Sequence, residues 1–222
     1  VPAVFALILQ QTLLIGIGIR GGGAREDAAR VVAPAPAGGA REDAARGAGG
    51  AAAAPAPNGG AAPRSLAASA SVVLGRAAAY CALYFVHVVF YFGVVCPLHG
   101  FGGAPDAAPR VLAFTAPFIV AVTFLGLACA DFWPRRETAL QTLMFTSIPA
   151  AFLAGFAWPA QAIPLWLRAP AALIPSTTGI AGLVRVLRMG ARLPDVAWEW
   201  GILWALAALY FSLAVAAETR RG

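Results

Sequence analysis

Five apolar stretches, separated by polar or turn-forming connections, run along the chain. They cover residues 3–19, 77–95, 111–130, 138–158 and 197–217. A helix needs about 20 mainly apolar residues to cross a bilayer, and lipid offers no partners to an irregular backbone. The pattern therefore predicts an all-α polytopic membrane protein with about five transmembrane helices. Because the first stretch is short and lies close to Val1, we expect the chain to begin inside a longer protein.

The connection between the first two stretches, residues 20–66, is rich in Gly, Ala and Pro. This composition predicts a flexible cytoplasmic loop. The loop contains the sequence GAREDAAR twice, at residues 23–30 and 39–46. Each copy places a Glu four residues before an Arg, which favours a short helical turn by about 0.2–0.5 kcal/mol. We interpret the second copy as a low-complexity expansion.

Four prolines, at positions 159, 164, 170 and 175, interrupt the chain before the last apolar stretch. Residues 163–174 between them are apolar but too few to cross a membrane. Residues 159–196 are therefore predicted to form an outer re-entrant or interfacial segment. We expect Ser176 to cap an amphipathic helix that lies at the membrane surface. Its apolar face and its arginines are Ile180, Leu183, Val184 and Leu187, and Arg185, Arg188 and Arg192.

Composition supports the membrane assignment, because 60% of the residues are hydrophobic and 12% are charged. Soluble domains carry about 25% charged residues. All sixteen basic residues are Arg, and they lie mainly in the connections, so we expect no nucleic-acid partner. Eleven of them fall on one side of the predicted topology and five on the other. The bias predicts an amino end outside and a carboxyl end in the cytoplasm.

The sequence contains no motif for catalysis. Without Lys it cannot form a P-loop, and it has neither a GxSxG nor an HExxH motif. We predict no catalytic residue, no cofactor and no metal site, so any use of ATP requires a partner subunit. Cys81, Cys96 and Cys129 lie in or beside apolar stretches. We interpret them as small buried residues instead of disulfide or metal-binding residues.

A polar stripe marks the second stretch. Tyr80, Tyr84, His87 and Tyr91 are spaced by four, three and four residues, which places them on one helix face. Two interpretations stay open: a face that packs against neighbouring helices, or a transport path in the membrane.

Other polar residues sit within or beside the spans. Those in the first and fourth spans are interpreted as groups that form interhelical hydrogen bonds, with a role as substrate ligands as the alternative. These are Gln10, Gln11, Thr12, Gln141, Thr142 and Thr146. Glu199, between two tryptophans, is interpreted as an interfacial anchor. Asp131, Arg135, Arg136 and Glu137 are interpreted as a solvated turn or as a contact for a cytoplasmic partner.

Four segments occur in an order that resembles a known family. They are FALILQQTLLIGIG (residues 5–18), RRETALQ (135–141), FLAGFAWP (152–159) and IPSTTGIAGLVRVLRMGA (174–191). Together they resemble the permease subunits of the type-2 ABC transporters, especially the exporter branch with a large extracytoplasmic domain. The similarity covers nearly the whole chain except about residues 31–63.

The resemblance implies a single permease membrane domain over residues 1–222, located in the bacterial inner membrane. Such permeases have six spans, work in pairs with a second permease subunit, and bind a separate ABC ATPase. In this branch a periplasmic adaptor protein joins them. The family's coupling helix contacts the ATPase, and its loop begins here at Arg20. Arg25, Glu26 and Arg30 are therefore the candidates for that contact.

Two departures from the family bear on these expectations. The family's first span and outer domain are missing, and the coupling loop holds the second GAREDAAR copy. Which copy docks on the ATPase stays open. The alternatives to an ATP-driven exporter are a secondary transporter with His87 as its proton-carrying group, and a non-transporting scaffold or truncated remnant.

Overall fold

A computed structural model describes residues 2–32, 65–98, 107–130, 135–153 and 171–220. Every regular element in these ranges is helical. They are α1 (Pro2–Val32), α2 (Leu66–Phe90), the π-helix η1 (Tyr91–Val95), α3 (Cys96–Leu98), α4 (Ala107–Cys129), α5 (Arg136–Leu153), α7 (Pro175–Arg188), the short 3-10 helix η4 (Leu193–Val196) and α8 (Ala197–Thr219).

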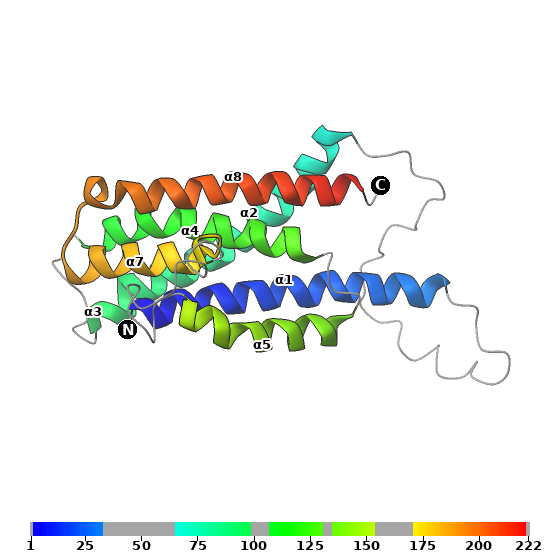
Figure 1. Ribbon diagram of the computed structural model, residues 1–222, viewed down its shortest axis with the longest axis horizontal. Coiled ribbons are helices and arrows are strands. Elements are labelled where there is room, and N and C mark those ends of the chain that lie inside the picture. Colours follow the sequence, from blue (N-terminus) through cyan, green and yellow to red (C-terminus); the bar gives the residue numbers. More distant parts are fainter. Residues whose placement is uncertain (1, 33–64, 99–106, 131–134, 154–170, 221–222) are drawn as a thin grey trace.

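The long helices run side by side in one elongated bundle, with the amino and carboxyl ends at opposite ends of it (Figure 1). Four helical segments in the described ranges are long and apolar enough to cross a membrane: Phe5–Ala24, Leu66–Leu98, Ala108–Cys129 and Leu193–Thr219. The prediction of a polytopic helical membrane protein is confirmed. The fourth predicted span corresponds to α5, which does not meet this criterion within Arg136–Leu153. Residues 154–158 lie outside the described ranges.

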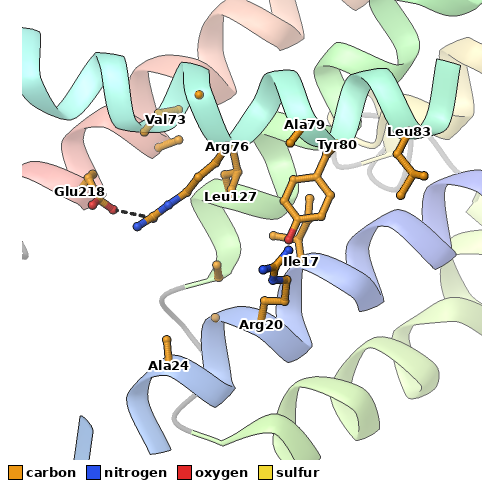
Figure 2. A pocket seen from close by; sticks show the side chains of 14 residues that line it. Ile17, Arg20, Ala24, Val73, Arg76, Ala79, Tyr80, Leu83, Leu127 and Glu218 are labelled. Atoms are coloured by element: carbon orange, nitrogen blue, oxygen red, sulfur yellow. Dashed lines mark hydrogen bonds and ion pairs between the residues drawn. The ribbon is translucent and has the colours of Figure 1, made fainter. Parts of the chain in front are cut away.

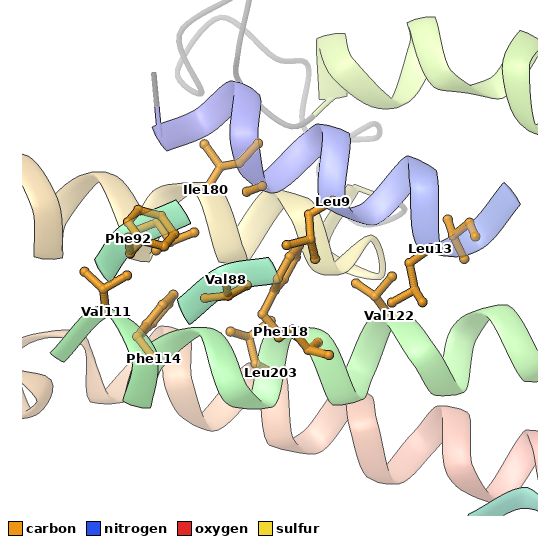
Figure 3. Packing of buried hydrophobic residues seen from close by; sticks show 14 of the residues in the cluster. Leu9, Leu13, Val88, Phe92, Val111, Phe114, Phe118, Val122, Ile180 and Leu203 are labelled. Atoms are coloured by element: carbon orange, nitrogen blue, oxygen red, sulfur yellow. The ribbon is translucent and has the colours of Figure 1, made fainter. Parts of the chain in front are cut away.

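The centre of the bundle is α4, which packs against α1, α2, α7 and α8. Phe114, Phe118 and Val122 point from α4 into the interior, where they meet Leu9 and Leu13 of α1 (Figure 3). Val88, Ile180 and Leu203 bring α2, α7 and α8 to the same cluster. Lipid tails are as apolar as these side chains, so burying them between helices gains little hydrophobic free energy in a membrane. Close packing is therefore what holds the helices together.

Two glycines on α7 accommodate the large rings of α4. A Cβ atom added at Gly179 would lie 2.6 Å from Cδ2 of Phe118, and one added at Gly182 would overlap the ring of Phe114. Small residues let helices approach closely in membranes. These two positions therefore set the distance between α7 and α4.

Two helices extend beyond the predicted limits. The helix α1 continues to Val32, thirteen residues past the predicted end of the first span, and it includes the first GAREDAAR copy. The second copy lies outside the described ranges. α2 begins at Leu66, eleven residues before the predicted start, and the Ser65 hydroxyl accepts a hydrogen bond from the amide of Ala68 (3.3 Å). The small residues at the start of α2 favour a helix, but they did not mark this part of the chain as belonging to the apolar stretch.

The amphipathic helix after the prolines exists as α7, but Ser176 does not cap it. The N-cap residue is Ile174, Pro175 follows it, and the Ser176 side chain is buried. Proline suits the first helical position because its missing donor has no partner there anyway. The apolar face of α7 packs on α1, α4 and α8, so protein covers the face that we expected to lie on the membrane. Residues 154–170 lie outside the described ranges.

Candidate functional site

A cleft of about 990 Å³ lies where α1 and α2 separate at the carboxyl-terminal end of the bundle. These two helices make little direct contact with each other, while each packs on α4. The walls of the cleft come from α1, α2, α4 and α8. At Gly21 an added Cβ would lie 3.0 Å from the Cβ of Ala130, so the backbone of α1 closely approaches the end of α4 there. The cleft is as large as a small-molecule site.

Charged and apolar side chains share this cleft (Figure 2). Arg76 donates from Nη1 to Glu218 Oε2 at 3.2 Å, which ties α2 to α8. The Glu218 side chain is 5% exposed, whereas that of Arg76 is 50% exposed. Arg20 and Tyr80 project into the space between α1 and α2. The two arginines and one glutamate give the charged lining a net charge of +1.

The predicted tyrosine stripe is divided between different surroundings. Tyr80 lines the cleft, and Tyr84 packs against the core. Tyr91 opens the π-helix and stacks on Phe5 of α1, with ring centroids 4.1 Å apart. His87 is exposed, and its Nδ1 lies 3.1 Å from the Leu83 carbonyl oxygen of its own helix. The stripe therefore forms no continuous polar path through the described interior.

Arg25, Glu26 and Arg30 lie on the last turns of α1. In Figure 1 this end of α1 projects beyond α4 and α5. The beginning of α5 and the carboxyl-terminal end of α8 lie at the same end of the bundle. Here Arg135 and Glu137 are exposed, and Asp131 lies outside the described ranges. The fold therefore brings together, at one end of the bundle, segments that the arginine bias predicts to lie on the same side of the membrane.

The opposite end of the bundle is tied together by several polar contacts. Arg185 of α7 donates to Glu199 of α8 (Nη1 to Oε1, 2.5 Å) and to the carbonyl oxygen of Asp195 (2.8 Å). Arg110 of α4 donates to the carbonyl oxygen of Gly190 (2.9 Å). The indole of Trp200 donates to the carbonyl oxygen of Ala113 (3.3 Å). Glu199 is therefore an ion-pair partner that joins two helices, and Arg185 binds it instead of facing lipid headgroups alone.

Other polar predictions had mixed outcomes. Thr12 and Thr146 donate to carbonyl oxygens of their own helices, Ile8 and Thr142, so their predicted interhelical bonds are wrong. Gln10 is buried, and its Oε1 has no hydrogen-bond partner in the described part of the chain. An interhelical bond does occur between Cys81 and Thr123, at 3.6 Å. All three cysteines are free thiols.

The cleft residues Arg20, Arg76 and Glu218 were not singled out from sequence. Each lies at the boundary of an apolar stretch, where a charge is expected to mark a solvated loop. Only one signal was available: Arg76 is an isolated charge beside long apolar runs, and Glu218 is the first charge after the last apolar stretch. That pattern does not identify which charges meet, because the two are 142 residues apart.

Comparison with known proteins places the chain in a family. The family described as "ABC-2 family transporter protein" matches residues 68–216. The chain is 29% identical over 141 residues to the linearmycin resistance permease protein LnrN of Bacillus subtilis (strain 168). That alignment covers 61% of this chain and 36% of the relative, so the chain spans about a third of the length of the curated relative it matches. No solved structure matches. The chain belongs to the ABC-2 family transporter proteins and is a multi-pass membrane protein.

Proposed function

We propose that this member of the ABC-2 family is the transmembrane permease subunit of an ABC exporter in the bacterial inner membrane. It would contribute the transport path, while a separate ATPase subunit hydrolyses ATP. A second permease subunit and a periplasmic adaptor protein would complete the assembly. The family match carries this proposal, together with the similarity to a protein named as a linearmycin resistance permease.

The projecting end of α1 is the proposed contact for the ATPase. It forms a continuous helix with the part of α1 that packs on α4, α5 and α7. A rigid helix transmits a displacement along its length, so a push on residues 25–30 would move the wall of the cleft that contains Ile17 and Arg20. α2 would stay behind because it is joined to α8 through Arg76 and Glu218. The cleft between α1 and α2 would then change in volume.

The orientation of the bundle follows from the same proposal. The ATPase is cytoplasmic, so the end of the bundle that contains the cleft and the carboxyl terminus would face the cytoplasm. The end tied by Arg185 and Glu199 would face outward. In this arrangement the described structure is open toward the cytoplasm and closed at the outer side. Cargo would enter from the cytoplasm or the inner leaflet.

Co-purification with an ABC ATPase tests the proposal. The chain would be co-expressed with a candidate ABC ATPase from its source organism, and the complex would be isolated through a tag on the ATPase. Arg25→Glu combined with Arg30→Glu should abolish co-purification. The matched control is Arg41→Glu combined with Arg46→Glu in the second GAREDAAR copy, which should leave it intact. Loss of the complex in the control alone would assign docking to the second copy. A well-folded wild-type chain that never binds the ATPase would refute the proposed function.

A further inference from the structure

We propose that the cleft between α1 and α2 is a binding site for an anionic amphiphile, a molecule with one acidic head group and an acyl-sized apolar tail. The cleft combines a cationic rim with apolar walls at the end of the bundle where the spans finish. Binding at this site would need no ATPase. It therefore goes beyond the proposed transport function and can be tested separately.

Arg20 provides the charge that would meet the acidic head. In the described part of the chain Arg20 makes no ion pair or hydrogen bond, and its side chain is exposed toward the cleft. A guanidinium presents five N–H donors in a planar fork that suits phosphate and carboxylate oxygens. Arg76 uses Nη1 for Glu218 and stays half exposed beside the same space. The negative charge of Glu218 is already balanced by that contact, so the net charge facing a ligand is positive.

Tyr80 lies between the charged and the apolar parts of the cleft. It projects from α2 into the same space as Arg20 (Figure 2). A tyrosine presents a hydrophobic ring with a polar hydroxyl at its tip, which suits the junction between a head group and a tail. Its hydroxyl would donate to an oxygen of the head while its ring contacts the first carbons of the tail.

The apolar walls accommodate the tail. Ile17, Val73, Leu83 and Leu127 line the cleft from three different helices. Beyond Leu83, the exposed face continues with Val86 and Phe90 of α2 and Val94 of η1, which are 65%, 59% and 44% exposed. A tail that leaves the cleft along α2 would therefore stay against apolar side chains. A small inorganic anion would use only the rim and should bind weakly.

Thermal stability of the detergent-purified chain gives the first test. A ligand that binds the folded state raises the midpoint of thermal unfolding in a concentration-dependent manner. Oleoyl lysophosphatidate should stabilise the wild-type chain. Oleoyl lysophosphatidylcholine, which has the same tail and a zwitterionic head, and inorganic phosphate, which has no tail, should bind at least about tenfold more weakly. Equal stabilisation by lysophosphatidylcholine, or by phosphate alone, would overturn the proposal without any variant.

Substitutions then locate the site. Arg20→Gln should weaken lysophosphatidate binding about tenfold, because it removes a charge-assisted contact. Arg20→Lys should restore part of the affinity, because lysine retains the charge but lacks the planar fork of donors. Arg188→Gln is the matched control, since Arg188 is an exposed arginine at the opposite end of the bundle. Unchanged affinity in Arg20→Gln, or an equal loss in Arg188→Gln, would place the ligand elsewhere and overturn the proposal.

A competition experiment identifies the source of the ligand. The chain would be placed in nanodiscs of phosphatidylcholine, with or without phosphatidylglycerol, and titrated with lysophosphatidate. Competition by phosphatidylglycerol would show that an anionic bilayer lipid occupies the cleft. Lack of competition would show that the cleft selects a single-chain amphiphile. Both results support an anionic amphiphile site and differ only in the origin of its occupant.

Discussion

The two ends of α8 each carry a glutamate that pairs with an arginine, but the two pairs have different surroundings. Glu199 and Glu218 are nineteen residues apart, which is about 28 Å along a helix and close to the thickness of the hydrocarbon core. Glu199 binds Arg185 at an end where α4, α7 and α8 are also joined by backbone acceptors. Glu218 binds Arg76 beside an open cleft.

The difference shows that an ion pair alone does not determine whether an end of the bundle is closed. At the Glu199 end the helices already touch, because Gly179 and Gly182 let α7 approach the rings of α4. The ion pair then adds to a packed contact. At the Glu218 end α1 and α2 stay apart, so the pair holds α2 to α8 but leaves the space between α1 and α2 unfilled.

Enlarging Gly182 should have the largest effect on this contrast. In Gly182→Ala the new methyl group would overlap the Phe114 ring and force α7 away from α4. Overpacking of this kind costs about 3 kcal/mol. The midpoint of thermal unfolding, measured by size-exclusion chromatography after heating, should fall clearly. Gly201→Ala in α8 is the control, because an added Cβ there meets nothing within 4 Å. Equal stability of the two variants would show that close packing does not close this end.

Removing the ion pair at the closed end should have the next largest effect. Glu199→Gln leaves Arg185 with the Asp195 carbonyl but without its charged partner. A lost charge-assisted hydrogen bond costs about 2 kcal/mol. Thermal unfolding in detergent measures the loss, and the charge-swapped pair Arg185→Glu with Glu199→Arg should recover part of it. The double variant should be more stable than the less stable of the two single variants, Arg185→Glu and Glu199→Arg. If it is not, the two side chains do not interact directly.

Removing the pair at the open end should destabilise the fold less. Arg76 is half exposed although the Glu218 carboxylate is buried, so Arg76→Gln gives up an ion pair with one partner in solvent, worth about 1 kcal/mol. Its main effect should be on mobility, since α2 would lose a tie to α8. Crosslinking between a cysteine introduced at the start of α2 and one at the end of α8 should be slower with Arg76→Gln than without it. A loss of stability larger than that of Glu199→Gln would reverse the ranking of the two ends.

His87→Ala should have the smallest effect. The imidazole is exposed and bonds only to a carbonyl of its own helix among the described residues. Exposed substitutions usually change stability by less than about 0.5 kcal/mol. Efflux by the reconstituted assembly and its pH dependence should match those of wild type. An efflux rate that collapses, or that loses its pH dependence, would instead favour a proton-driven transporter and would break the assignment of function to the cleft.

Some of the candidate site could be predicted and some could not. The stripe of tyrosines and His87 follows from helical spacing, which correctly places Tyr80, Tyr84 and His87 along α2, with Tyr91 at the start of the π-helix that follows. Spacing does not tell which of them meet protein, however. Tyr91 stacks on Phe5 while His87 faces outward, because the π-helix and the path of α1 decide the neighbours.

Hydropathy along the chain was enough to predict the class of the protein and the approximate places of its helices. Long apolar runs can only cross a membrane as helices, since every backbone group must be paired inside them, and the last predicted span begins at the residue where α8 begins. Three features could be seen only in the folded chain: where α1 ends, that protein covers the apolar face of α7, and which arginine pairs with which glutamate. These features depend on contacts between residues far apart in the chain, and hydropathy and spacing describe only neighbours along it.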